Sequence, residues 1–487
     1  MKYQSGNLPA ISGVDRRDEE FMTSQPMRPN MTSLKMKLLG GAFFMAAAGF
    51  AGTASATDIF GGGATLPAPA MTQAFKCYSG ATTGVDYRVR DSANNLNDTA
   101  EAACPSYITT PVNAAHLYHY AASGSGRGIA GFYSHDASRF GTYLSTPFTS
   151  VEYALSDNAL KQADLDAYNN GGTIQGVTVV APGVTPTPGT NYANPFEKYG
   201  ALIQVPNVIG AVAVAYKVPT GVTIGTASGK LELTKADYCK IFNGAVSYWD
   251  QLPNVTGHVR IYRTGRSDSS GTTSLFTRHM AAVCSFLSTN KFKDPAGTGT
   301  LPSTTGWRLG AGNSGVATIL SSTNGAIGYL GSEFLVGSSL VAASLQEGTS
   351  ATFLQPTAAN ATAAYNSLAF PTPAGADQFN PLKWVPTNLN SSVANPTAGY
   401  PIMGTSNTLL YSCYSSAAKV NALLAPNTGA LGFFRWYYTN AAVNASNGVL
   451  AANGVAALPS ALRTSIYNFL RANIKATGGT GCVGKGA

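Results

Sequence analysis

The sequence has 487 residues, of which 44% are hydrophobic, 10% aromatic and only 11% charged, with 53 Gly and 26 Pro. This length is enough for about two to three domains, and the low charged content excludes a charged disordered chain, a coiled coil and a typical helix-rich cytosolic enzyme. The formal net charge of +8 comes without a dense Lys/Arg run. We therefore expect no nucleic-acid partner, and at most a modest steering of an anionic ligand.

The first part of the chain, residues 1–56, is typical of a leader followed by a signal peptide. Lys35 and Lys37 precede an apolar stretch over residues 38–52, and the small residues Ala54-Ser55-Ala56 follow it. This order predicts export and cleavage after Ala56. The alternative is a membrane anchor, but the apolar stretch is shorter than the roughly 20 residues of a membrane span. Because no Cys stands at the cleavage point, we predict a periplasmic or secreted protein without a lipid anchor.

Six cysteines lie beyond the predicted cleavage point, and no two of them are spaced C-x-x-C. An even number of cysteines in an exported protein favours disulfides over zinc or redox motifs. Their connectivity does not follow from the sequence, and some could remain free buried thiols. Pairing in sequence order is our working prediction, with bonds Cys77–Cys104, Cys239–Cys284 and Cys413–Cys482.

Along the chain, short apolar runs alternate with helical patterns and with turns rich in Gly, Ser and Thr. We predict strands that start at Asp58, Tyr120 and Gly325, and further strands over Ser150–Tyr153, Val205–Lys217, Val259–Tyr262 and Leu409–Tyr414. We predict helices after Pro67 and Pro69, before Gly131, over part of 234–250 with Thr234 as N-cap, from about Ser274, and over 415–425 and 458–475. The polar segment 77–122 resembles an insertion, and 181–200 and 346–398 resemble loops. This alternation predicts an α/β fold.

Three Gly/Ser/Thr turns precede predicted helices, where ligands of α/β proteins bind. They contain Thr65-Leu66, Gly124-Ser125-Gly126 and Ser270-Gly271-Thr272, and Arg266 stands four residues before Ser270. The N-terminus of a helix offers unpaired N–H groups and partial positive charge, which bind oxyanions. One such turn is common in any protein, but three turns with an adjacent Arg favour an anion site.

Two acidic residues, Asp157 and Asp268, accompany these turns although a carboxylate repels most anions. Monohydrogen phosphate carries a proton that a carboxylate can accept, whereas sulfate carries none, so a carboxylate would select between the two. Asp268 can also hold Arg266 through a charge-assisted fork. The alternative for Asp157 is a helix cap, because Leu-Ser-Asp-Asn precedes a helical stretch.

The sequence shows no recognised catalytic motif, since G-x-S-x-G, H-E-x-x-H and Walker loops are absent. Ser269 and Ser270 have no His or Lys at a recognisable spacing, which favours hydrogen bonding over nucleophilic catalysis. His116 and His119 stand three residues apart in the polar segment and could share a metal. The motif search therefore gives no support for a catalytic site.

These segments occur together, and in the same order, in a known family. GGGATLPAP, the turn at 124–126, LSD at 155–157, KIFNGAVSYWD at 240–250, RSDSSGTTS at 266–274 and GAIGY at 325–329 resemble the phosphate-binding proteins of ABC transporters. The start at Asp58-Ile-Phe-Gly-Gly-Gly is similar to the DING subgroup, with Phe60 in place of Asn. The 45-residue spacing of Cys239 and Cys284 also suits the subgroup. Leu66 in place of Phe and Arg127 after Gly126 depart from the family pattern.

The resemblance implies a two-lobed periplasmic-binding-protein (type II) α/β fold with hinge strands near Val212–Lys217 and Met403–Ser406. Lobe one would comprise 57–214 plus 405–487, and lobe two 215–404. The implied ligand is inorganic phosphate, and the implied partner of a monomeric protein is an inner-membrane ABC phosphate permease. The family is a binding module, so the resemblance implies no cofactor and no enzymatic turnover, although a weak phosphoesterase activity is not excluded. The implied phosphate-binding residues are Thr65, Leu66 through its backbone, Ser125, Asp157, Arg266, Asp268, Ser270, Gly271 and Thr272.

Three functions are compatible with these observations. The first is a receptor that delivers phosphate to a transporter. The second is a secreted DING-type scavenger or phosphatase-like protein, which the insertions and six cysteines would fit. The third is a structural or adhesive protein that has kept the fold, but the complete set of predicted ligands argues against it.

Overall fold

The computed structural model describes residues 56–80, 86–87, 103–140, 148–174, 177–179, 195–287, 290–292, 299–425 and 431–487. Residues 54–487 form one compact unit. The predicted leader and signal peptide lie outside the described residues, except for Ala56, and so does most of the 181–200 loop. Within the described residues, no helix is long and apolar enough to cross a membrane.

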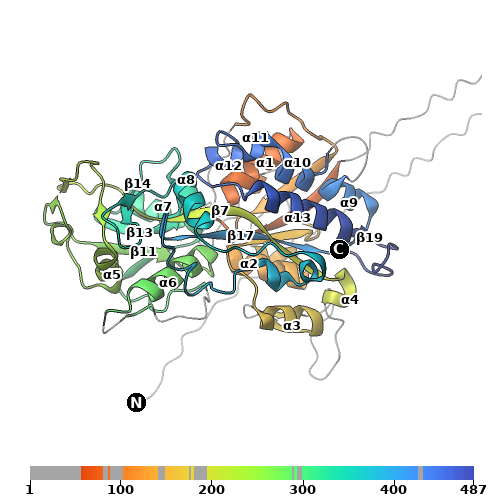
Figure 1. The fold of residues 1–487 in the computed structure, drawn as a ribbon, viewed down its shortest axis with the longest axis horizontal. Coiled ribbons are helices and arrows are strands. Elements are labelled where there is room, and N and C mark those ends of the chain that lie inside the picture. The colour runs from red at the N-terminus through yellow and green to blue at the C-terminus, as the bar shows by residue number, and fades with distance from the viewer. Residues whose placement is uncertain are drawn as a thin grey trace, which may run out of the picture. The chain divides into compact units, whose positions relative to one another are not determined.

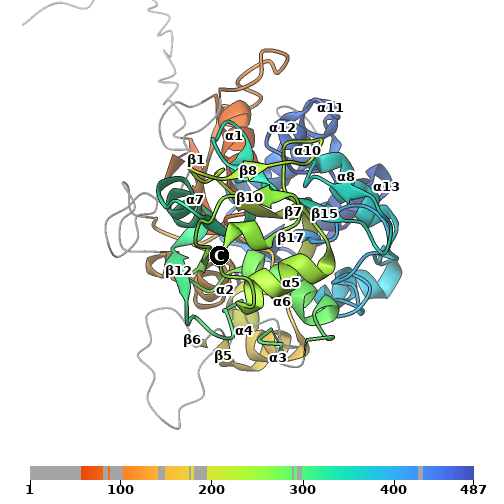
Figure 2. The ribbon, with the colours of Figure 1, turned by 90° about the vertical axis from the view of Figure 1, so that its left-hand side faces the viewer.

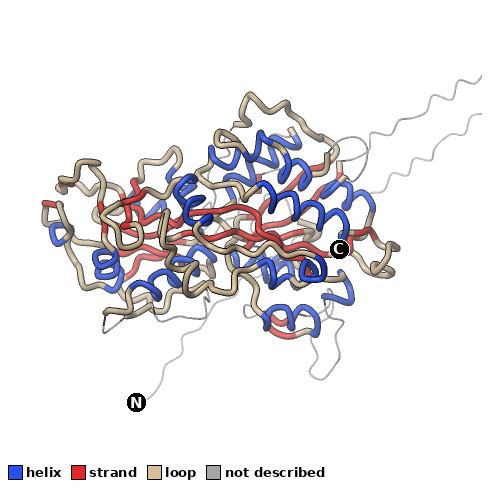
Figure 3. The backbone as a smooth tube through the Cα atoms, in the orientation of Figure 1, coloured by secondary structure: helices blue, strands red, loops and turns tan. Residues whose placement is uncertain are grey.

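A mixed ten-stranded sheet runs through this unit in the order β12-β11-β13-β7-β17-β4-β1-β3-β2, and β14 also pairs with β7. Figure 3 shows the strands as a central layer with helices on both sides. The strands are β1 Thr57–Gly63, β2 Asp86–Tyr87, β3 His116–Ala121, β4 Tyr153–Ser156, β7 Leu202–Tyr216, β11 Tyr262–Arg266, β12 Trp307–Gly310, β13 Ala326–Gly331, β14 Val341–Ala342 and β17 Met403–Tyr411.

The long strand β7 connects two groups of parallel strands (Figure 1). Its first part, through Ala211, pairs antiparallel with β17, which in turn pairs with β4. Its last part, Val212–Tyr216, pairs with β13, next to β11 and β12. All fifteen residues of β7 are buried, as expected for a β-branched, apolar strand that is covered on both faces. The α/β class with connecting hinge strands is therefore confirmed, while the predicted lobe boundaries stay a prediction.

Helices flank the sheet and follow most of its strands. They are α1 Ala68–Ser79, α2 Ser125–Ser134, α3 Gln162–Asn170, α4 Pro195–Tyr199, α5 Lys235–Asn243, α6 Gly271–Val283, α7 Gly312–Ser322, α8 Ala358–Asn366, α9 Ala417–Leu424, α10 Phe433–Thr439, α11 Ala441–Asn444, α12 Val449–Ala452 and α13 Ser460–Asn473. Thr234 is the N-cap of α5, as predicted, and accepts a hydrogen bond from Asp237 N. Short strands complete the fold: β5 Gly172–Ile174 pairs with β6 Val177–Val179, β8 Thr223–Ile224 with β10 Val255–Thr256, β15 Ser344–Gln346 with β9 Glu232–Leu233 and β16 Phe353–Leu354, and β18 Cys413–Tyr414 with β19 Lys475–Ala476.

The cysteines are joined in sequence order. Disulfides connect Cys77 to Cys104, Cys239 to Cys284 and Cys413 to Cys482, and no described cysteine is free. The second bond ties the middle of α5 to the residue after α6. It therefore fixes the helix whose opposite end carries the Ser270-Gly271-Thr272 turn.

Two segments that the sequence assigned to insertions or loops contain regular structure. Part of 77–122 is β3, which pairs with β1 and lies second from one edge of the sheet, next to the two-residue strand β2. Its polar flanks hid an apolar alternation in which Tyr118 and Tyr120 are fully buried. Likewise, 346–398 contains α8, whose Ala-rich, weakly amphipathic sequence gave little helical signal. The strand predicted at Val259–Tyr262 instead begins at Tyr262 and ends at Arg266, and α6 begins at Gly271 rather than near Ser274.

Candidate functional site

The predicted ligand turns lie where strands of the central sheet end. Thr65 and Leu66 follow β1, Ser125 begins α2 after β3, and Asp157 follows β4. These three strands run parallel and are neighbours, so their carboxyl ends lie at one edge. Arg266 ends β11, and the Ser270 turn leads from there into α6. The order of strands therefore gathers residues that are up to 207 positions apart in the sequence (Figure 1).

Arg266 is the buried cation at the centre of this group. Its Nε donates to Asp268 Oδ1 over 2.8 Å and its Nη2 donates to Asp268 Oδ2 over 2.5 Å, which forms the predicted fork. Its Nη1 donates to Thr65 Oγ1 over 2.9 Å and to Asn313 Oδ1 over 3.0 Å. Burial disfavours the charged guanidinium, but the Asp268 carboxylate outweighs burial and raises the pKa of Arg266. The side chain thus presents a fixed, permanently charged donor toward Thr65.

Asp157 is the buried anion of the group. Burial raises the pKa of its carboxyl to about 6, although nearby Ser406 and Arg266 lower it in part. Neither carboxylate oxygen has a hydrogen-bond partner within the described part of the chain. The hydroxyls of Thr272 and Ser406, which lie near this carboxylate, are also buried without a partner. Because buried polar groups are normally satisfied, this concentration of unpaired atoms is the signature of a site for a polar ligand.

The helix-cap alternative for Asp157 is wrong. The following helix, α3, begins five residues later and has Lys161 as its N-cap, with Asp164 bonded to the Lys161 N–H. The backbone N–H of Asp157 donates a hydrogen bond to Ser125 Oγ over 3.1 Å. Its carboxylate therefore serves no helix end and remains directed to the polar group around Thr272 and Ser406.

The N-termini of α2 and α6 are in direct contact at this site. Gly126 N donates to Ser269 O over 3.3 Å. A Cβ placed on Gly271 would lie 2.4 Å from Asp157 Cβ and 2.6 Å from Ser125 Oγ, and a Cβ on Gly124 would lie 2.5 Å from Asp268 Oδ2. Only glycine permits this approach. The first turns of both helices therefore lie in the same small region, where the partial positive charges of the two N-termini add.

The remaining predicted residues have different roles in this arrangement. Ser270 is the N-cap of α6, and its Oγ accepts from Thr273 N over 3.2 Å, so its hydroxyl is partly committed to the helix. The Leu66 side chain packs against Gly210 of β7, which leaves its backbone as the part that faces the turn. Thr272 is fully buried. All nine predicted residues thus belong to one buried neighbourhood, except that Asp268 is slightly exposed.

Three further residues belong to the site, and the sequence analysis did not identify them. Asn313 accepts from Arg266 and donates to Glu333 Oε1 over 3.2 Å. Burial raises the pKa of Glu333 well above its usual value, so this carboxyl is expected to be neutral. Ser406 comes from the hinge strand β17. A fourth Gly-rich turn, Gly310-Ala-Gly-Asn-Ser-Gly before α7, was the signal for Asn313, and Gly312 N donates to Asp268 Oδ1.

The two histidines considered as metal ligands, His116 and His119, are not placed to bind one metal ion together. They stand three residues apart on strand β3, so their side chains point to opposite faces of the sheet. His119 Nε2 bonds to Asp58 Oδ1 at 2.6 Å, and its ring stacks on Phe60. Within the described residues, no group of His, Cys, Asp and Glu is arranged to hold a metal.

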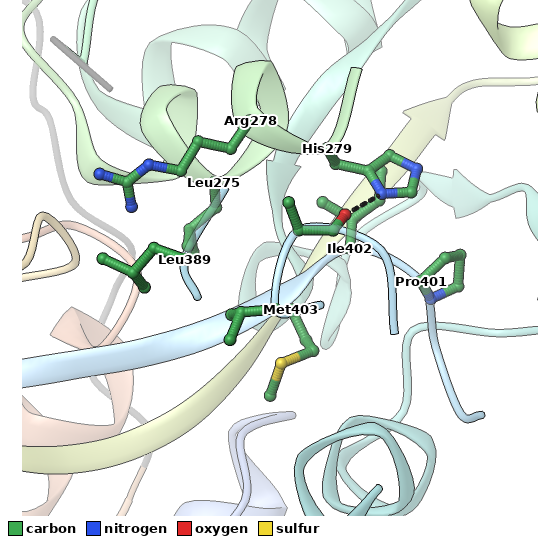
Figure 4. A pocket seen from close by; sticks show the side chains of 9 residues that line it. Leu275, Arg278, His279, Leu389, Pro401, Ile402 and Met403 are labelled. Carbon is green, nitrogen blue, oxygen red and sulfur yellow. Dashed lines mark hydrogen bonds between the residues drawn. The ribbon is translucent and has the colours of Figure 1, made fainter. Parts of the chain in front are cut away.

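A small pocket lies on the other side of α6 and is unsuited to an anion of phosphate size (Figure 4). Its volume is about 10 Å³, which is the size of one water molecule. His279 closes one wall through a 2.7 Å hydrogen bond from its ring to Ala394 O, and Figure 4 shows the Arg278 guanidinium turned away from it. Met403 of the hinge strand lines the pocket, so we interpret it as a packing defect at the hinge.

Comparison with known proteins agrees with this geometry. A sequence model of the PBP superfamily domain matches residues 48–441. The chain belongs to this superfamily. It is 33% identical over 356 residues to alkaline phosphatase L of Pseudomonas aeruginosa strain PAO1, an alignment that covers 72% of this chain and 81% of the relative.

Other proteins that are similar to this chain carry names that refer to phosphate. The chain is 29% identical over 410 residues to a phosphate-binding protein of an unknown prokaryotic organism, covering 78% of this chain and 96% of the relative. Among solved structures it is similar to a high-affinity periplasmic phosphate-binding protein (PfluDING) bound with phosphate, with 25% identity and a TM-score of 0.58. That alignment covers 88% of this chain and 99% of the other. The resemblance to phosphate-binding proteins and their DING members is thereby confirmed.

Proposed function

We propose that this protein binds one inorganic phosphate ion with high affinity at the buried site formed by Arg266, Asp157 and the N-termini of α1, α2 and α6. The observation that carries the proposal is the unpaired carboxylate of Asp157 beside the unpaired Thr272 hydroxyl, within one site with the fixed guanidinium of Arg266. Relatives whose names or structures refer to phosphate binding support it.

The charges of the site explain why phosphate would be preferred. Asp268 already neutralises Arg266, so the ligand's charge must be balanced by N–H groups and hydroxyls, as helix N-termini do for oxyanions. The carboxylate of Asp157 would repel an anion without a proton. Monohydrogen phosphate can donate a hydrogen bond from its O–H group to that carboxylate, whereas sulfate has no proton to donate. The site therefore combines general anion binding with selection by protonation state.

Calorimetry on protein stripped of ligand tests the proposal. We expect phosphate to bind with one ion per chain and sulfate to bind at least about a thousandfold more weakly, because an unneutralised carboxylate facing the anion costs several kcal/mol in a dry site. Absence of phosphate binding would refute the function. Equal affinity for the two anions would refute selection by Asp157 and leave a general oxyanion site.

We further propose that the protein is a binding protein that needs no turnover. Ser270 Oγ caps α6, and the buried His279 bonds to Tyr238 and Ala394, so these two side chains are engaged in structural hydrogen bonds. The second candidate is a phosphatase-like activity, which the name of the Pseudomonas relative favours. Hydrolysis of a chromogenic phosphate ester by the wild type that disappears in Arg266→Ala would establish this second candidate.

The proposed setting is the periplasm or the exterior of the cell, after removal of the signal peptide. There a monomer would deliver phosphate to an inner-membrane ABC permease or retain it as a scavenger. The signal-like sequence over residues 31–56 and the three disulfides, which form in oxidising compartments, support export. Cell fractionation together with a phosphate-uptake assay in a deletion strain distinguishes the two fates.

A further inference from the structure

A second cationic site lies at the opposite ends of the strands that carry Arg266. A groove of about 390 Å³ opens where β11 and β12 begin, next to the C-terminus of α5. Figure 2 views the molecule from the side that shows α5 and β12. Three arginines line the groove, one in β11, one in β12 and one just before β11: Arg263, Arg308 and Arg260.

Aromatic rings hold these arginines in place. The guanidiniums of Arg260 and Arg308 lie 5.8 and 4.5 Å from the centroid of the same Tyr262 ring. The guanidinium of Arg263 lies 5.6 Å from the Trp307 ring. Cation–π contacts of this kind orient a guanidinium while its N–H edge stays available. The rings therefore act as supports for the charges rather than as stacking surfaces for a ligand.

Arg263 forms the floor of the groove. Its Nη1 donates to Phe242 O and its Nη2 donates to Thr305 O. A Cβ on Gly306 would lie 2.5 Å from Arg263 Nη2, and one on Gly244 would lie 3.0 Å from Nη1. Both glycines have positive φ, 74° and 82°. Close packing by two glycines and two carbonyls thus fixes this guanidinium.

The three positive charges have no acidic counterpart in the described part of the chain. No described carboxylate forms an ion pair with Arg260, Arg263 or Arg308. The acidic residue on the neighbouring turn, Asp250, is held by His258 at 2.8 Å. Burial without a carboxylate lowers the pKa of Arg263. Like charges gathered in this way repel one another, and a multiply charged anion would relieve that repulsion.

We propose that this groove binds a compact polyanion of the oligophosphate class through Arg260 and Arg308, with Arg263 supplying charge from below. Several observations favour this ligand class over a single phosphate ion. The groove is open and within the size range of small-ligand sites, Arg260 and Arg308 are exposed, and the donors are spread over three side chains. A hydrated ligand with several phosphate groups matches that spacing, because each guanidinium can take a different group through a bidentate contact.

Calorimetric titration with tripolyphosphate tests the proposal, with inorganic phosphate present at saturation so that the Arg266 site is filled. We expect one tripolyphosphate per chain, with affinity that falls as salt rises. The double variant Arg260→Ala/Arg308→Ala should weaken tripolyphosphate binding at least about tenfold, because two charge-assisted contacts are lost. It should bind phosphate as the wild type does.

The matched control is Arg435→Ala/Arg471→Ala, which removes the same charge from α10 and α13. It should keep tripolyphosphate affinity within about twofold, since Figure 1 shows these two helices at the other end of the molecule from α5 and β11. Three outcomes would overturn the proposal. One is no tripolyphosphate binding to the wild type at low salt. Another is an equal loss in both double variants, which indicates general attraction. The third is binding of poly-glutamate as tight as that of tripolyphosphate, which indicates a surface for an acidic protein.

Discussion

At the scale of single residues, Arg266 organises the site because it contacts both groups of strands. Its partners Asp268 and Asn313 come from the β11–α6 and β12–α7 turns, and Thr65 comes from the β1–α1 turn. Sequence motifs identified Arg266, Asp268 and Thr65, because each belongs to a recognisable Gly/Ser/Thr turn. They did not identify Glu333, since a carboxyl becomes a buried partner of Asn313 with a raised pKa only through tertiary packing.

We predict that Arg266→Ala weakens phosphate binding at least about tenfold, since a charged hydrogen bond in a closed site is worth roughly 1.5–3 kcal/mol. The change also leaves Asp268 without its partner. Arg266→Lys keeps the charge but loses the fork, so it should bind phosphate between the wild type and the Ala variant. Calorimetry on folded variants, verified by circular dichroism, measures the effect. Unchanged affinity in Arg266→Ala would show that phosphate binds elsewhere.

At the scale of elements, the site depends on how closely α6 approaches α2 and the end of β4. The sequence located the turns, but it placed the start of α6 near Ser274 instead of Gly271. The cause is that Ser, Thr and Gly in the first turn read as loop residues, whereas Ser270 serves as the helix cap. The interpretation of Asp157 as a helix cap failed for the related reason that the polar groups around its carboxylate come from distant segments, namely α2, α6 and β17.

Gly271→Ala tests the close approach of these elements. The added methyl would lie 2.4 Å from Asp157 Cβ, a distance that forces the two groups apart. We predict at least about a tenfold loss of phosphate affinity, comparable to the loss of one charged contact. The control is Gly225→Ala, where the nearest atom would be at an ordinary 3.4 Å. If both variants bind phosphate as the wild type does, the contact between α2 and α6 does not belong to the bound state.

The disulfide between α5 and α6 supports the same helix. Its 45-residue separation corresponds to about 4 kcal/mol of stabilisation in the chain-entropy description. Cys239→Ser/Cys284→Ser should therefore lower the free energy of unfolding by about that amount, as measured by urea denaturation. Thiol titration of unreduced, denatured wild type should find essentially no free thiol. Two or more reactive thiols per chain would contradict the pairing.

At the scale of the whole molecule, the alternation of strands and helices was enough to predict the α/β class, and the run VPNVIGAVAVAYK was enough to predict a strand buried on both faces. Only the Tyr120 end of strand β3 was predicted, because the other His and Tyr residues of the strand are polar or aromatic and their burial depends on α1 and α10. There Tyr118 packs against Phe75 and Phe433. Helix α8 was likewise hidden by its Ala- and Asn-rich composition.

The mature chain is predicted to begin at Thr57 or Asp58, because Ala54-Ser55-Ala56 offers small residues at the cleavage point. The first strand begins at Thr57, so cleavage there would leave the sheet complete. Intact-mass measurement of the exported protein should give a chain without Lys35 and Lys37. An exported chain that retains them would contradict this prediction.

The most direct test of the phosphate site is the ratio of phosphate to sulfate affinity in Asp157→Asn, measured by calorimetry at several pH values. Burial raises the pKa of Asp157 to about 6, so the wild-type carboxyl is ionised above that pH and accepts the phosphate proton. Below it, the carboxyl is neutral and no longer repels sulfate. The account predicts that wild-type selectivity for phosphate falls as pH drops through about 6, and that Asp157→Asn has low selectivity, at least about tenfold below the wild type at pH 8. An unchanged ratio in Asp157→Asn at pH 8 would contradict the account.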